Sequence, residues 1–465
     1  MIANTHDDLT TQGCAKSKVD YLIVGNSAAA IAAVEKIRAS DRQGSITMIS
    51  PEPYAAYGRP LISYLIEGKT DDAHMAYRPS DFYKLSRIET RFGSGCAAVS
   101  LDAAKHQVQL ENGETIEYGK VLFSTGSVPF VPPIKGIEGR NNVYAFLSLD
   151  DARGVQNEAL AATAAAHVKG RSSRAIVIGA GLIGLKAAEA LLPHIDEVLV
   201  LEMAPRILPA VLDEEGASLL REQLADRGIT CMPGITADEL LGAGDRISGA
   251  HLTDGTEVAC DMVVAAVGVR PNSAILDTAG AKSERGIVCD SSMRTSLADV
   301  YAAGDVTQTT DVLDGAKRPL ALWPNAVAQG KVAGACMADA PDAPAFDGAF
   351  AVNAVDFFDI SLLTSGVINP APDGGYTVKT FCDSVSYTKL VMRDDKLFGY
   401  ILLNGPDNAG IYTALINDGT PLSSLADDFF AQDPSNIGFS QQARWDRLHR
   451  FYPADLNRLG VKERA

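Results

Sequence analysis

Seven cysteines occur among the 465 residues, and no two of them form a C-x-x-C pair. Metal and iron–sulfur sites normally need clustered thiolates, so we expect no metal site in this chain. Residues 1–17 contain no apolar stretch of the kind found in secretory signals. The longest apolar runs, such as 262–269, are far shorter than the ~20 residues that cross a bilayer. These absences predict a cytoplasmic protein that contacts no membrane.

Basic residues are scarce relative to acidic ones: 41 against 58, which gives a formal net charge of −17. Such a charge repels the phosphates of nucleic acids and argues against a nucleic-acid partner. It also disfavours a small acidic electron carrier, unless a local basic patch receives it. The length suits about three domains of ~150 residues, and 46% hydrophobic residues are enough for buried cores.

A phosphate-binding motif begins near the N-terminus. A predicted strand over 21–24 leads into Gly25-Asn-Ser27-Ala-Ala-Ala30, followed by a predicted helix over 28–40 and a strand over 46–49. Small residues in such a turn let the backbone approach a pyrophosphate, and the new helix offers its N–H groups and the positive end of its dipole. An acidic residue should follow the second strand to bind the adenosine ribose. The nearest is Glu52, two residues later than expected.

A second copy of the motif starts about 154 residues later, as Gly179-Ala-Gly181-Leu182-Ile183-Gly184. Glu202 follows the next predicted strand, 198–201. A carboxylate there binds both ribose hydroxyls and repels a 2′-phosphate, which favours NAD over NADP. Arg206 is close enough to favour the opposite choice. One motif is a weak signal, but two indicate two dinucleotides, most simply FAD and NAD, placed to exchange a hydride.

Three further segments are typical of loops around a flavin nucleotide. Pro60 suits the first position of a helix. Arg59 before it is either a phosphate contact or an exposed surface residue. Gly304-Asp305 ends a short predicted strand, where a carboxylate is suited to bind the sugar-alcohol chain of a flavin. Pro324-Asn325 precede a predicted helix over 327–337, whose dipole would stabilise a reduced, anionic flavin.

The order of these motifs resembles that of the FAD/NAD-dependent pyridine nucleotide oxidoreductases, which include glutathione reductase, NADH oxidase, and the rubredoxin and ferredoxin reductases. The matching segments are Gly25-x-Ser27-x-x-Ala30, Ser124-Thr125-Gly126, Gly179-x-Gly181-x-x-Gly184, Gly268-Val-Arg-Pro-Asn272 and Tyr301-Ala-Ala-Gly304-Asp305. Through this resemblance Thr125, Gly126 and Gly268 are implied as cofactor contacts. The similarity extends from residue 20 to about 425.

The resemblance implies an α/β fold with two Rossmann-like nucleotide-binding domains, as in glutathione reductase, and a C-terminal α+β interface domain. The implied FAD-binding domain is interrupted by the NAD-binding domain. The expected parts are FAD-binding over 18–150, NAD-binding over 151–284, FAD-binding again over 285–345, interface over 346–430, and an extended arm over 431–465.

Two departures from the family pattern bear on the chemistry. Disulfide reductases of this family need a cysteine beside the flavin, but Pro60 holds that place and no cysteine lies between Cys14 and Cys96. Disulfide chemistry is therefore not expected. Lys186 stands where many relatives have glutamate lining the nicotinamide pocket. We expect it either to favour a reduced, anionic flavin, as a catalytic residue, or to lie exposed on its helix.

The chain resembles the flavoprotein (epsilon) subunits of NAD-dependent phenylglyoxylate dehydrogenases. This implies an FAD- and NAD-binding subunit that exchanges electrons with iron–sulfur partner subunits of a 2-oxo acid or aldehyde oxidoreductase complex. Two alternatives stay open. One is a stand-alone NADH:rubredoxin or ferredoxin reductase or NADH oxidase, which could form a homodimer. The other is a redox-sensing regulator in which NADH reduction of FAD alters a binding surface.

Overall fold

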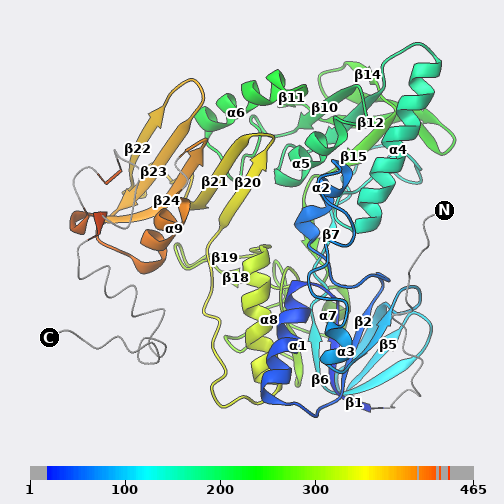
Figure 1. The fold of residues 1–465 in the computed structure, drawn as a ribbon, viewed down its shortest axis with the longest axis vertical. Helices are drawn as coiled ribbons and strands as arrows, with labels where there is room; N and C mark the ends of the chain where they lie inside the picture. Colours follow the sequence, from blue (N-terminus) through cyan, green and yellow to red (C-terminus); the bar gives the residue numbers. More distant parts are fainter. Residues whose placement is uncertain (1–17, 406–407, 426–428, 431–437, 440–465) are drawn as a thin grey trace. The chain divides into compact units, whose positions relative to one another are not determined.

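A computed structural model describes residues 18–405, 408–425, 429–430 and 438–439 (Figure 1). The chain divides into two compact units, one formed by residues up to 207 together with 224–351, the other by 208–223 together with the residues from 352 on. The finer five-part division stays a prediction, and most of the expected arm over 431–465 lies outside the described residues.

The first sheet of the larger unit contains the N-terminal glycine motif. Its order is β3-β2-β1-β6-β5-β4, with β17 also paired to β6. Strands β1, β2, β3, β6 and β17 run parallel, and β4 and β5 are antiparallel. The strands are β1 (Lys18–Val24), β2 (Ile46–Ser50), β3 (Ile88–Phe92), β4 (Ala98–Asp102), β5 (Gln107–Leu110), β6 (Thr115–Phe123) and β17 (Val300–Ala302).

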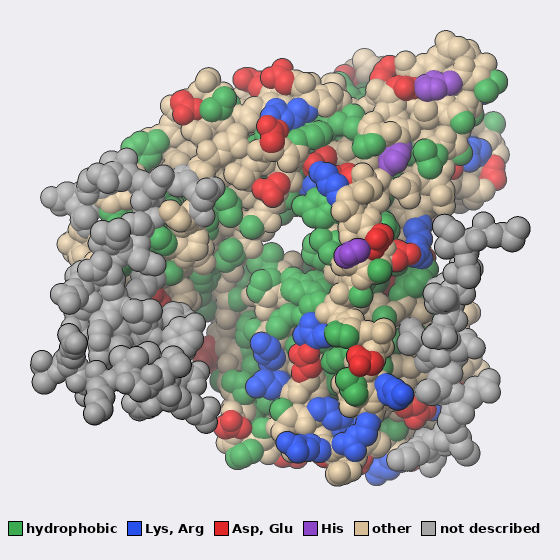
Figure 2. Space-filling view, in the orientation of Figure 1, with side chains coloured by type: hydrophobic (Ala, Val, Ile, Leu, Met, Phe, Trp, Pro, Cys, Tyr) green, Lys and Arg blue, Asp and Glu red, His purple; other side chains and the backbone are tan. Residues whose placement is uncertain are grey.

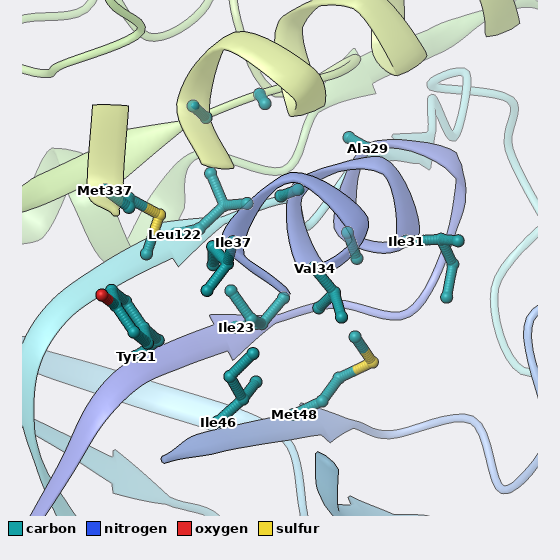
Figure 3. Packing of buried hydrophobic residues seen from close by; sticks show 14 of the residues in the cluster. Tyr21, Ile23, Ala29, Ile31, Val34, Ile37, Ile46, Met48, Leu122 and Met337 are labelled. Carbon is teal, nitrogen blue, oxygen red and sulfur yellow. The ribbon is translucent and has the colours of Figure 1, made fainter. Parts of the chain in front are cut away.

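Helices α1 (Ala28–Ser40) and α8 (Trp323–Met337) pack closely beside this sheet. A Cβ added at Gly330 would lie 2.2 Å from the carbonyl oxygen of Ala29, and one at Gly334 would lie 2.2 Å from that of Ala33. The two helix backbones therefore touch, which only glycine permits. Below them, side chains of α1 interleave with those of β1 and β2 in a closed apolar core (Figure 3). This packing fixes the first residue of α1 at the carboxyl edge of the sheet.

The second sheet of this unit contains the other glycine motif and is parallel throughout, in the order β11-β10-β9-β15-β8. A three-stranded antiparallel sheet, β12-β13-β14, completes this part. The elements are β8 (Val143–Tyr144), α4 (Leu149–Val168), β9 (Arg174–Ile178), α5 (Leu182–Leu191), β10 (Glu197–Glu202), β11 (Ile229–Pro233), β12 (Ala237–Ala243), β13 (Arg246–Leu252), β14 (Glu257–Ala259) and β15 (Met262–Ala265).

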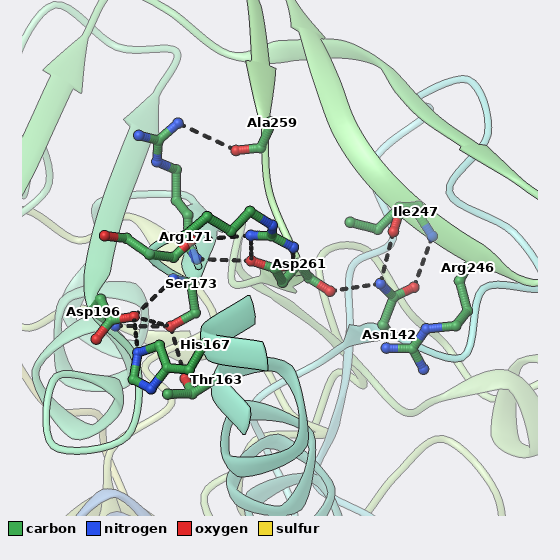
Figure 4. Close-up of polar contacts among 12 residues, drawn as sticks. Asn142, Thr163, His167, Arg171, Ser173, Asp196, Arg246, Ile247, Ala259 and Asp261 are labelled. Carbon is green, nitrogen blue, oxygen red and sulfur yellow. Dashed lines mark hydrogen bonds and ion pairs between the residues drawn. The ribbon is translucent and has the colours of Figure 1, made fainter. Parts of the chain in front are cut away.

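Polar side chains clamp the amino edge of the second sheet (Figure 4). Asp196, just before β10, accepts hydrogen bonds from the backbone and side chain of Ser173, just before β9. Asp261, just before β15, pairs with Arg171 and accepts from the backbone of Arg174. Asn142, just before β8, bonds to the carbonyls of Asp261 and Ile247. These contacts all lie at the amino edge, opposite the edge that contains the second glycine turn.

Short elements link the two parts of this unit. Strand β7 (Ser127–Pro129) leaves β6 and pairs antiparallel with β16 (Val269–Pro271), which leaves β15. The remaining pieces are η1 (Arg59–Leu61), α2 (Ile62–Ile66), α3 (Phe82–Leu85), α7 (Ala274–Thr278), β18 (Thr309–Thr310) and β19 (Lys317–Arg318).

The smaller unit is an antiparallel sheet, β20-β21-β24-β23-β22, with α9 against β24 and β21. Tyr387 and Lys389 on β23 both hydrogen-bond the carboxylate of Asp213, at 2.6 and 2.7 Å, which ties the segment before α6 to the sheet. The elements are α6 (Glu214–Asp226), β20 (Val352–Phe357), β21 (Ile360–Gly366), β22 (Thr377–Cys382), β23 (Tyr387–Arg393), β24 (Lys396–Leu403), α9 (Ala409–Asp418) and η2 (Leu422–Ser424).

The expected fold class is confirmed: two parallel, Rossmann-like regions accompany an antiparallel C-terminal sheet with a helix. Two local expectations differ. Pro60 lies within the 3-10 turn η1, ahead of the helix proper, and α8 begins at Trp323 instead of 327, so that Pro324 is inside its first turn. Among the described residues, no helix combines the length and apolar character needed to cross a membrane.

The α1–α8 contact predicts the outcome of a glycine replacement. We expect Gly334→Ala to destabilise the protein by ~1–3 kcal/mol, because the new methyl group forces the two backbones apart. Gly410→Ala is the matched control, since a Cβ at that helical position meets nothing within 4 Å. Thermal unfolding should show a lower melting temperature for the first variant alone; equal melting temperatures would contradict the packing argument.

Candidate functional site

The turn between β1 and α1 is shaped for close approach of a ligand to the backbone. Gly25 has φ +115°, and a Cβ there would lie 2.3 Å from the carbonyl oxygen of Ser124. Ser27 is extended, and its side chain makes no capping hydrogen bond to the first turn of α1. Ala30 is fully buried where α1 meets the core. The N–H groups that begin α1 have no side-chain cap, which suits an anionic phosphate.

Asp305 follows β17 at the same edge of the sheet. Its carboxylate accepts one long hydrogen bond, 3.3 Å, from the Ser127 hydroxyl. Burial raises the pKa of Asp305, and Ser127 and Arg59 only partly offset this. The buried amide of Gln329 on α8 accepts from the backbone N–H of Gly304 at 2.7 Å and so fixes the loop. A half-buried carboxylate with so little hydrogen bonding fits the hydroxyl groups of a flavin side chain.

Glu52 and Arg59 lie together and pair with each other. The guanidinium of Arg59 forms an ion pair with Glu52 and lies 5.0 Å from the centre of the Tyr57 ring. Tyr57 donates to Glu52 at 2.7 Å. Burial alone would lower the pKa of Arg59, but Glu52, Tyr57 and Asp305 together raise it. Arg59 is therefore a held cation beside Asp305, and its phosphate contact, like the ribose contact of Glu52, stays a prediction.

The paired strands β7 and β16 bring two predicted segments side by side. The Thr125 hydroxyl donates to the carbonyl of Asn272 at 2.8 Å, and the Asn272 N–H donates to that of Gly126 at 2.9 Å. Gly126 has φ +68° and Gly268 φ +107°, and nothing lies within 4 Å of a Cβ at either. Asn325, which follows Pro324 at the start of α8, donates a hydrogen bond from its side-chain amide to the carbonyl of Leu320 at 3.2 Å.

The second glycine turn repeats the geometry of the first. Gly179 has φ +103°, and a Cβ there would lie 2.5 Å from the carbonyl of Ala266. A Cβ at Gly184 would lie 1.9 Å from the carbonyl of Gly179, whereas one at Gly181 would meet nothing within 4 Å. The first and third glycines thus allow packing, and the second faces open space. Leu182 and Ile183 form the first turn of α5, with Ile183 37% exposed.

Glu202 ends β10 against this turn. Its carboxylate accepts from the backbone N–H of Ala180 at 2.7 Å and of Ala204 at 2.8 Å. These two bonds hold the carboxylate beside the start of α5, where the ribose of a dinucleotide lies in Rossmann-like folds. Arg206 is half-buried four residues later. These residues fit NAD, because the Glu202 carboxylate can accept hydrogen bonds from ribose hydroxyls and the backbone at Gly181 is open to a ligand.

Lys186 is not exposed on its helix: its side chain is 13% exposed. Its ammonium lies 2.5 Å from the carboxylate of Glu189 and 3.7 Å from that of Glu67. These two carboxylates balance the positive charge of Lys186, which would weaken its expected effect on the charge of a flavin. The sequence analysis missed Glu67, Ser127 and Gln329, because none of them belongs to a glycine motif. A signal existed only for Glu67, which is an acidic residue at the end of the apolar helix α2.

Several of the described cysteine thiols have raised pKa values. Burial raises the pKa of Cys96, and it raises those of Cys260 and Cys289 to about 12. Within the described residues, no group of three His, Cys, Asp or Glu side chains could hold a metal ion.

Basic side chains gather over the part of the larger unit that contains α1 and α3 (Figure 2). In this region Arg38 donates to the carbonyls of Ser86 and Arg87, and Arg87 donates to the carbonyl of Arg42. A local basic patch therefore exists on this acidic chain.

Comparisons with known proteins agree with this geometry. A family model described as pyridine nucleotide-disulphide oxidoreductase matches residues 19–330. The chain is 30% identical over 422 residues to the NADH-dependent phenylglyoxylate dehydrogenase subunit epsilon of Aromatoleum evansii, covering 90% of this chain and 96% of that protein. It is 27% identical to nitrite reductase [NAD(P)H] of Bacillus subtilis over 88% of this chain, but it spans only 48% of that protein.

Among solved structures, an NAD-dependent persulfide reductase from A. fulgidus superposes with a TM-score of 0.78 at 25% identity, covering 93% of this chain and 83% of that one. The comparisons agree with FAD and NAD as the cofactors.

Asp305 should be a main contact of bound FAD. We expect Asp305→Ala to weaken FAD binding by ~1.5–3 kcal/mol, the value of a charge-assisted hydrogen bond. Asp305→Asn, which keeps an acceptor, should lose less. Equilibrium dialysis of the apoproteins with FAD measures both constants, and an unchanged affinity in the alanine variant would remove Asp305 from the site.

Glu202 should set the preference for NAD over NADP. Repulsion between its carboxylate and a 2′-phosphate should be worth on the order of 2 kcal/mol at an effective dielectric of about 20. The ratio of kcat/KM for NADH to that for NADPH should therefore fall at least tenfold in Glu202→Ala. If the wild type uses the two cofactors equally well, Arg206 dominates instead.

Proposed function

We propose that the chain, which belongs to the pyridine nucleotide-disulphide oxidoreductase family and is an NAD(H)-dependent flavoprotein oxidoreductase, acts as the flavin subunit of a larger complex. In this role it exchanges electrons between NAD(H) and iron–sulfur partner subunits that oxidise a 2-oxo acid of the phenylglyoxylate type or an aldehyde. The carrying observation is the match to the epsilon subunit of phenylglyoxylate dehydrogenase, because it extends over nearly the full length of both chains.

The surroundings of the predicted flavin site support a partner outside the chain. Pro60 occupies the 3-10 turn next to Arg59. The thiols of Cys96, Cys260 and Cys289 all have raised pKa values, so they are poor nucleophiles at neutral pH. A disulfide-reducing enzyme of this family needs a thiolate beside the flavin. Pro60 stands where such an enzyme has its cysteine, which favours an acceptor on another molecule.

The chain's own residues would bind and orient the cofactors. Asp305 would hold the flavin side chain, the first turns of α1 and α5 would each receive a pyrophosphate, and Glu202 would select NAD. FAD, when bound, takes two electrons from a nicotinamide and releases them singly, which iron–sulfur clusters require. The basic side chains that gather over α1 and α3 (Figure 2) support a docking place for an acidic partner in spite of the net charge of −17.

Purification of the tagged chain from its source tests the proposal. We expect iron–sulfur subunits to copurify in fixed ratio, and the isolated chain to reduce one-electron dyes with NADH but not glutathione or coenzyme A disulfides. Anaerobic reduction with NADH should produce no long-wavelength thiolate–flavin band. A chain that purifies alone and reduces rubredoxin or ferredoxin would favour the stand-alone enzyme, and rapid disulfide turnover would contradict both.

A further inference from the structure

A cluster of four charged side chains joins α2 to α5. The ammonium of Lys186 lies 2.5 Å from Glu189 Oε2 and 3.7 Å from Glu67 Oε1. Lys69 lies 2.5 Å from Glu67 Oε2 and 3.9 Å from Glu189 Oε1. The ring of Tyr64 is near both ammonium groups, 4.8 Å from that of Lys186 and 5.6 Å from that of Lys69. Two cations and two anions therefore share one small volume.

Burial makes Lys186 the critical cation of this cluster. The side chains of Glu67 and Glu189 are 4% and 3% exposed, and that of Lys186 is 13% exposed, whereas Lys69 is 56% exposed. Glu67 Oε1 is buried and accepts no hydrogen bond; the Lys186 ammonium lies 3.7 Å from it, whereas Lys69 pairs with the other oxygen, Oε2, at 2.5 Å. Taking a carboxylate out of water is costly unless an opposite charge accompanies it. Solvent screens the exposed Lys69 more than the buried Lys186, so each ångström of separation from Lys186 matters more to the two carboxylates.

The cluster lies between the segments that carry the two predicted cofactor sites. Helix α2 follows directly on η1, which contains Arg59 and Pro60. Lys186 is in the turn of α5 just after Gly184. The carbonyl of Ile66, at the end of α2, is also within 2.6 Å of His194 Nε2. Displacement of α2 relative to α5 would thus move Arg59 relative to the second glycine turn.

We propose that Lys186 is a positioning residue that, through Glu67, holds α2 against α5 and so fixes the alignment of NADH with FAD. Because two carboxylates balance its charge, the ammonium acts on geometry more than on the charge of the flavin. The inference deepens the proposed function and rests on it only in requiring that NADH reduce bound FAD. A displacement of about 1 Å between reacting groups lowers rates by roughly 100-fold, so a rigid pair between the two segments is valuable.

The first test uses the apoprotein and needs no cofactor. Amide hydrogen exchange of residues 59–69 and 182–191 should be roughly tenfold faster or more in Lys186→Met than in the wild type, since local opening becomes easier. Arg171→Met is the matched control: it also strips the ion-pair partner from a largely buried carboxylate, Asp261 (14% exposed), but at the amino edge of the sheet. Its exchange at 59–69 should stay at the wild-type level.

The second test measures reduction of bound FAD by NADH in rapid mixing. At saturating NADH, Lys186→Met should be about 10- to 100-fold slower, Arg171→Met unchanged and Lys186→Arg close to wild type. Glu67→Gln should restore at least part of the rate to Lys186→Met, because the double variant keeps one buried carboxylate, Glu189, and one cation, Lys69, 3.9 Å from it. If Lys186→Met does not fold, the single variant Glu67→Gln tests the inference instead. Reduction of its FAD by NADH should be slower than in the wild type by roughly threefold or more.

Three outcomes would overturn the inference. They are wild-type exchange at 59–69 and wild-type reduction in Lys186→Met, no recovery in the double variant, and a Glu67→Gln protein identical to wild type. The proposed function fails differently, because then the wild-type chain itself lacks iron–sulfur partners while NADH still reduces its FAD.

Discussion

Direct contact between backbone atoms at two glycine turns is the constraint on which the rest of the larger unit depends. At Gly25 and at Gly179 a carbonyl of the neighbouring strand occupies the place of a Cβ, at 2.3 and 2.5 Å. Any side chain there would push the turn away from its sheet. With glycine, each helix begins in direct contact with the carboxyl edge, and its first N–H groups lie where Rossmann-like folds bind a pyrophosphate.

The two edges of the second sheet differ in the contacts that they make. At the amino edge, hydrogen bonds connect the residues that precede four of its strands: Asn142, Ser173, Asp196 and Asp261 (Figure 4). At the opposite edge the Glu202 carboxylate accepts hydrogen bonds from two backbone N–H groups, which hold it beside α5. A saturated polar network is rigid, so it can hold a frame around a site that has to remain open to ligand.

Most of the polar side chains at the predicted cofactor sites are paired with one another. Arg59 pairs with Glu52, Lys186 with Glu189 and Glu67, and Asp305 accepts a single long bond from Ser127. Paired cations have low freedom to move, whereas Asp305 retains unused acceptor capacity in a half-buried place. This contrast marks Asp305 as the group with most to gain from a ligand, and the ion pairs as the frame that keeps its surroundings in place.

The sequence by itself determined the two βαβ units, their glycine spacing and the acid that ends β10, because these depend on contacts within about thirty residues. Predicted strands and α1 agree with the structure to within a few residues. Only the tertiary structure decided that Ser127 reaches Asp305 across 178 residues, that Gln329 fixes Gly304, and that Lys186 faces Glu67. It likewise placed the start of α6 with the C-terminal sheet. Such partners are chosen by how helices and sheets pack, and no local pattern of residues encodes that choice.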